Sequence, residues 1–61
     1  MTELSFGQQS FLAQKIRDVM EVEPEKLWKM IETLDEKTYK FFLALSYNEP
    51  ENLKYEVNKL L

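Results

Sequence analysis

Two prolines, each flanked by glutamates, constrain the fold of this chain more than any other feature. Pro24 and Pro50 are the only prolines, and both stand in the phrase Glu-Pro-Glu. The residue before a proline avoids the α-helical conformation, whereas proline itself is favoured at the first position of a helix. Each phrase therefore predicts the end of one helix and the start of the next. The repetition has two open interpretations, an internal duplication or two uses of a good helix start.

The apolar residues between these breaks recur at helical spacing. The stripes are Leu12, Ile16, Val19 and Met20 in the first segment, Leu27, Ile31 and Leu34 in the second, and Leu53, Val57, Leu60 and Leu61 in the last. Asp35, followed by Glu36, predicts the N-cap of another helix. We therefore expect helices over about residues 8–21, 24–34, 36–47 and 50–60. They follow an N-terminal arm, residues 1–7, whose Leu4 and Phe6 are expected to pack against the body.

The stretch from Tyr39 to Tyr47 is the most apolar part of the chain. At 100° per residue, Tyr39, Phe42 and Tyr47 lie on one side of a helix, and Phe41 and Leu45 lie on the other. A helix that is apolar on two sides is either buried among other helices or presents one face to a partner. We therefore expect this third helix to be central, with Phe41 and Leu45 facing outward.

These patterns predict an all-α fold. With 61 residues the chain can form one small domain, residues 1–61, with a small core. Short turns place consecutive helices side by side or sharply crossed. We expect four short helices packed as two antiparallel helical hairpins, a small helical bundle.

The composition argues against catalysis and against bound cofactors. The chain has no cysteine, no histidine and a single glycine. These absences remove thiolate chemistry, the commonest general base, the commonest metal ligand and any glycine-rich phosphate loop. A chain of this size can hardly enclose a substrate. We expect no enzyme activity, no catalytic, cofactor or metal site, and no small-molecule substrate.

No apolar run approaches the roughly 18 residues of a membrane span, so we expect a cytoplasmic protein without membrane contact. The net charge of −3 disfavours binding to nucleic-acid phosphates. Six acidic residues stand at expected helix N-termini, where they complement the helix dipole rather than imitate DNA. They are Glu23, Glu25, Asp35, Glu36, Glu49 and Glu51.

A small dimeric helix-turn-helix regulator that binds DNA is the alternative interpretation, because short helices with tight turns have the right scale. Four lysines would supply positive charge, namely Lys26, Lys29, Lys37 and Lys40. Neither the second nor the third helix has an arginine for the bidentate guanine contact. Both helices also begin with carboxylates.

Protein binding is the function that the composition favours. Eight aromatic residues are too many for one small core to hide, and Tyr55 lies opposite the apolar stripe of its helix. Exposed aromatic side chains are typical interface anchors. We expect a small acidic regulator, adaptor or inhibitor that binds another protein or forms a homodimer. The expected protein-binding residues are Phe41, Leu45, Tyr47 and Tyr55.

Overall fold

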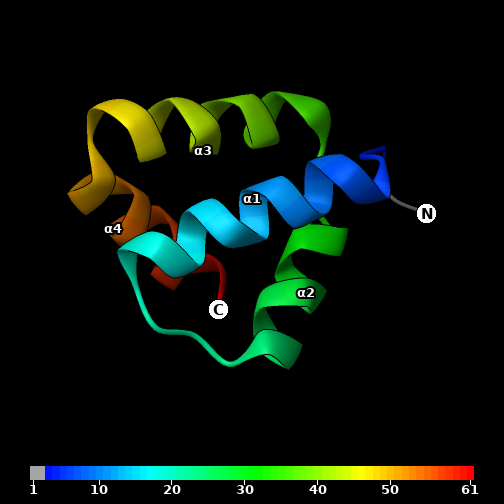
Figure 1. Ribbon diagram of the computed structural model, residues 1–61, viewed down its shortest axis with the longest axis horizontal. Coiled ribbons are helices and arrows are strands. Elements are labelled where there is room, and N and C mark those ends of the chain that lie inside the picture. Colours follow the sequence, from blue (N-terminus) through cyan, green and yellow to red (C-terminus); the bar gives the residue numbers. More distant parts are fainter. Residues whose placement is uncertain (1–2) are drawn as a thin grey trace.

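The computed structural model describes residues 3–61, and this part of the chain folds into four helices without a strand. The helices are α1 (Phe6–Val19), α2 (Pro24–Glu32), α3 (Glu36–Asn48) and α4 (Pro50–Leu60). The expected all-α class and the small helical bundle are therefore confirmed (Figure 1). None of the helices in the described part is long and apolar enough to cross a membrane.

α1 begins earlier than the sequence pattern indicated, because Ser5 and Gln8 form a capping box. The backbone N–H of Gln8 donates to Ser5 Oγ at 3.1 Å, and that of Ser5 donates to Gln8 Oε1 at 2.9 Å. This exchange satisfies donors that the first helical turn would otherwise leave free. The helix ends at Val19, since Met20 has an extended backbone.

Only part of the expected N-terminal arm remains outside α1. Residues 1–2 lie outside the described part of the chain. Leu4 is buried, and its carbonyl accepts a hydrogen bond of 3.1 Å from Nε2 of the buried Gln9. Phe6 is instead 76% exposed, although its ring stacks on Trp28 with centroids 6.1 Å apart. The expected packing of the arm is thus seen for Leu4, whereas Phe6 covers one side of Trp28 without being buried.

Both prolines stand in the first turn of a helix, as the Glu-Pro-Glu phrases predicted. Glu23 and Glu49 act as N-caps through their backbone carbonyls, which accept from the N–H groups of Leu27 and Leu53. Their side chains make no capping hydrogen bond. Proline supplies the helical φ angle here and lacks an N–H that would be left unpaired.

Two carboxylates accept hydrogen bonds from backbone N–H groups at the N-terminus of α3. Oδ1 of Asp35 accepts from the backbone N–H of Thr38 at 2.8 Å. Oε2 of Glu3 accepts from the backbone N–H of Glu36 at 3.2 Å. Negative charge is favourable at this end of a helix. The second hydrogen bond joins Glu3, at the start of the described chain, to α3, and α1 and α2 lie between these two points in the sequence.

α1 is the helix on which the other three pack (Figure 1). α3 lies beside α1 and runs in the same direction, while α2 crosses α1 steeply. α3 was expected to be central, but its close neighbours are α1 and α4. α1 takes the central place because all three other helices pack on its buried side chains. These side chains are Gln9, Leu12, Ala13 and Ile16.

The core is one cluster of apolar side chains, to which every helix contributes. Its buried members are Leu4, Leu12, Ala13, Ile16, Leu27, Met30, Ile31, Leu34, Tyr39, Phe42, Leu45, Leu53 and Val57. The last two residues of the expected α4 stripe depart from it, since Leu60 and Leu61 are 52% and 46% exposed. They lie beyond the part of α4 that neighbouring helices cover.

Truncation of the core should unfold the protein more readily than truncation of the surface. Leu53 is fully buried, so Leu53→Ala should lower the free energy of unfolding by about 2–5 kcal/mol. Tyr55→Ala, in the same helix but 64% exposed, should change it by no more than about 0.5 kcal/mol. Urea denaturation followed by circular dichroism measures both values. Similar losses in the two variants would contradict this core.

Acid should weaken the cap of α3. The hydrogen bond from the backbone of Thr38, followed by that from its side chain, lowers the pKa of Asp35. A lowered pKa in the folded state stabilises the protein above the unfolded value, about pH 4. This contribution is lost as the pH falls through the folded pKa. Asp35→Asn retains a capping oxygen but cannot ionise, so thermal melts between about pH 5 and 2 should show a smaller acid-induced loss. If the unchanged protein and Asp35→Asn lost the same stability in acid, the stabilising role of the ionised Asp35 carboxylate would be contradicted.

Candidate functional site

Five of the eight aromatic side chains remain exposed in the folded chain. They are Phe6, Phe11, Phe41, Tyr47 and Tyr55. Single exposed apolar residues are normal on a protein surface, whereas aromatic side chains are enriched at protein interfaces. The exposed rings are therefore the candidate functional surface.

Three of the four predicted binding residues are exposed. Tyr47 and Tyr55 are more than 60% exposed, and Phe41 is 49% exposed. Leu45 is only 8% exposed, so its expected outward position is wrong. α3 contacts both α1 and α4, and two neighbours cover a wider arc of a helix than one does. That arc takes in Leu45 together with Tyr39 and Phe42.

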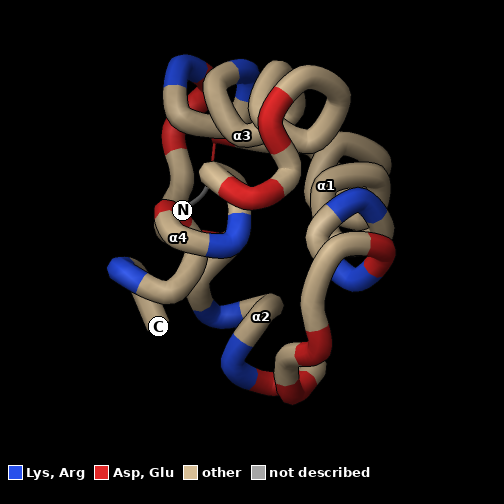
Figure 2. The backbone as a smooth tube through the Cα atoms, turned by 90° about the vertical axis from the view of Figure 1, so that its left-hand side faces the viewer, with Lys and Arg blue, Asp and Glu red and all other residues tan. Residues whose placement is uncertain are grey.

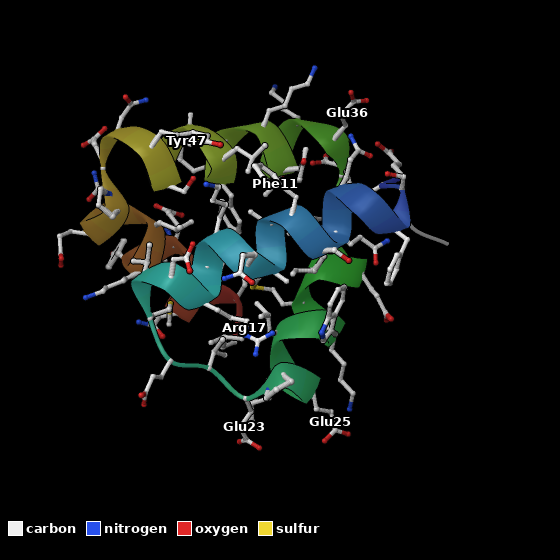
Figure 3. All side chains as sticks on the ribbon, viewed as in Figure 1. Phe11, Arg17, Glu23, Glu25, Glu36 and Tyr47 are labelled. Carbon is white, nitrogen blue, oxygen red and sulfur yellow. The ribbon has the colours of Figure 1, made fainter. Side chains whose placement is uncertain are left out.

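Lysine 15 joins two exposed rings across the seam between α1 and α3. Its Nζ atom lies 5.1 Å from the ring centroid of Phe11 and 4.8 Å from that of Tyr47. Both distances are within the range of a cation–π contact. Figure 3 shows Phe11 and Tyr47 along this seam. The lysine therefore contacts one ring from each helix, and we call these three residues the Lys15 clamp.

The Lys15 clamp could not be assembled from the sequence. Phe11 flanks the apolar stripe of the first helix, and Tyr47 ends the apolar stretch of the third. Nothing in their spacing indicates that they meet, because they are brought together only when α3 lies parallel to α1. The remaining predicted rings have neighbours within their own helices. Phe41 lies against Phe42 with centroids 6.0 Å apart, and Lys59 Nζ lies 5.2 Å from the ring of Tyr55.

A shallow groove at the other end of the bundle was also missed by sequence reasoning. Apolar side chains of α2, α4 and the turn between α1 and α2 line it, and lysines stand at its rim. Its volume is about 580 Å³. The one available signal was that Val22 is an apolar residue between two expected helices and that Leu60 and Leu61 are apolar residues at the end of the last one. Such residues have fewer neighbours than those in the middle of a helix.

Among residues 3–61, no three acidic side chains gather where they could hold a metal ion. Every buried side-chain nitrogen or oxygen in this range has a hydrogen-bond partner. The lowered pKa of Asp35 is explained by its cap on α3. Asp35 and the buried polar side chains therefore stabilise the fold. The exposed aromatic rings are the surface feature that the fold does not explain.

The Lys15 clamp should be measurable as an energetic coupling. In a double-mutant cycle of Lys15→Met and Tyr47→Leu, we expect a coupling of about 0.5–1 kcal/mol in the free energy of unfolding. The cycle of Lys15→Met with Phe41→Leu is the control, because the ring of Phe41 contacts Phe42 instead. Coupling of equal size in both cycles would show that Lys15 does not act through the ring of Tyr47.

Comparisons of the chain with protein-family models, with curated proteins and with solved structures found no match. What the protein does must therefore be inferred from its own surface. That surface offers exposed rings on three helices, two of them in contact with Lys15, and an apolar groove between α2 and α4.

Proposed function

We propose that this protein is a non-catalytic, cytoplasmic protein-binding module. It acts as a small regulator, adaptor or inhibitor by docking its exposed aromatic helical surface onto a partner protein or onto a second copy of itself. The exposure of five aromatic side chains on a domain with a single small core carries this proposal. Aromatic side chains are enriched at protein interfaces and among the residues that dominate binding energy.

The local contacts of these rings support a binding role. Lys15 restrains Phe11 and Tyr47, while Phe41 rests on the buried ring of Phe42. A side chain that is already held in place loses less conformational freedom when a partner binds. The rings are thus exposed and already in contact with neighbouring side chains, which suits them to act as anchors.

The charges around α2 and α3 weaken the alternative of a helix-turn-helix DNA reader. The N-terminus of α3 is capped by the carboxylates of Asp35 and Glu3. A reading helix would place phosphate or base contacts at this end. Glu23 and Glu25 point away from the body at the start of α2 (Figure 3). DNA phosphates would be repelled at both helix starts.

Partner capture tests the proposal. The protein, immobilised and exposed to a lysate of its native host, should retain a specific partner that mass spectrometry identifies. Phe41→Ala, Tyr47→Ala and Tyr55→Ala should each leave the helical circular dichroism intact. Truncation of an interface anchor costs at least about 1–2 kcal/mol, so at least one variant should capture roughly ten-fold less partner.

Lys37→Ala is the matched control, because Lys37 is an exposed residue of α3 outside the ring contacts. Normal capture by all three ring variants would show that the aromatic surface is not the binding site. Retardation of bulk DNA in a gel at low salt would instead favour the helix-turn-helix alternative.

A further inference from the structure

We propose that the groove between α2 and the end of α4 binds an amphipathic helix of a partner protein whose polar flank is acidic. This inference goes beyond the proposed function, since the groove shares no residue with the exposed rings. Val22, Met30, Leu60 and Leu61 provide its apolar surface. Lys26 and Lys29 of α2 stand among the residues that line it.

The groove exists because α2 and α4 both pack on α1 without closing on each other. The close helix contacts of the described chain are α1 with each other helix and α3 with α4. Met30 is nearly buried at the base, whereas Leu60 and Leu61 stay about half exposed. Unbranched methionine adapts its shape to different partners, and Met-containing surfaces are common in grooves that accept helices. The accessible apolar surface is therefore provided mainly by Leu60 and Leu61, with Met30 beneath them.

Backbone hydrogen bonding favours a helix over an extended peptide. A β-strand segment binds by pairing with a sheet edge, and residues 3–61 form no strand that could offer one. A helix satisfies its own backbone groups and needs only an apolar surface for its side chains. A helix of about 15 residues is roughly 22 Å long, which is comparable with the 29 × 22 × 19 Å dimensions of the molecule.

The charges of α2 are divided between its two flanks. Lys26 and Lys29 lie on the groove side, and Glu25 and Glu32 lie on the flank that carries Trp28, by the 100° periodicity of the helix. Figure 2 shows the glutamates of residues 21–25 gathered at the turn that leads into α2, with the lysines beyond them. In a chain with a net charge of −3, the groove is thus lined by two lysines and one glutamate.

Few acidic side chains of the protein itself neutralise the two lysines of the groove. Glu23 is the single acidic residue that lines the groove, and its contact with Lys26 is 3.7 Å long between two exposed side chains. Such a surface pair contributes little and is easily exchanged for another partner. Lys29 has no ion pair within the described residues. Two lysines are therefore available to carboxylates on a bound helix.

A second copy of the chain fits this groove less well. A two-fold axis passing over α2 would bring Lys26 and Lys29 of one protomer against the same residues of the other. Like charges across an interface oppose association. An acidic helix from a different protein meets the same lysines with opposite charge, so it is the occupant that the rim favours.

Two synthetic helices provide the test. The first is an amphipathic peptide of about 18 residues with leucines on one face, glutamates along one flank and alanine or glutamine at the other positions, which favours a helix in water. The second has lysines in place of the glutamates. In ¹⁵N NMR titrations at low salt, the Glu peptide should shift amide signals of residues 22–33 and 57–61. It should bind roughly ten-fold more tightly than the Lys peptide, and this ratio should fall as salt is added.

Charge-reversal variants then test whether the lysines of the groove recognise the charge of the peptide. Lys29→Glu should weaken binding of the Glu peptide and strengthen that of the Lys peptide. Lys37→Glu makes the same charge change on an exposed residue of α3 and should leave the preference unchanged. Leu60→Ala should weaken both peptides while the helical circular dichroism stays intact.

Equal affinity for the two peptides would overturn the proposal, as would signal shifts centred on Phe41 and Tyr47. Self-association that shifts the signals of residues 22–33 in the absence of peptide would assign the groove to a second copy and would also overturn it. Failure here is distinct from failure of the proposed function, because the ring variants of the capture experiment lie outside the groove.

Discussion

Burial of the apolar arc of α1 is the interaction on which the rest of this structure depends. Leu12 and Ile16 are fully buried in the centre of that arc, and the small side chain of Ala13 lies beside them. The other three helices each pack on α1, so each buries its own stripe by covering part of this arc. Loss of α1 would leave α2 without its close helical neighbour. The bundle is therefore organised around its first helix rather than around its most apolar one.

This arrangement also explains the surface that the molecule exposes. Three helices packed on one cannot also close on each other everywhere, and α2 and α4 stay apart at the groove. α3 has more apolar side chains than two neighbours can cover, so Phe41 and Tyr47 stay in water. The aromatic surface and the groove thus have one origin. A chain of this size has more apolar side chains than its four short helices can bury among themselves.

Helical periodicity alone predicted part of the candidate site. Tyr55 stands opposite Leu53 and Val57 in α4, and a side chain in that position is exposed whatever covers the stripe. Leu45 could not be placed in this way, because α3 is apolar on two sides and periodicity does not say which side has two neighbours. The Lys15 clamp was equally hidden, since Phe11 and Tyr47 come from helices that could have met in other registers.

Local chemistry decided where the helices begin. Pro24 and Pro50 set the starts of α2 and α4, and Asp35 set that of α3, because each acts on backbone groups within a few residues of itself. The sequence by itself therefore determined the four helices, the all-α class and most of the buried stripes. Only the tertiary structure decided that α1 is central, that α3 runs parallel to it and that α2 and α4 leave a groove. These features depend on packing between segments distant in sequence, which the periodicity within one helix does not encode.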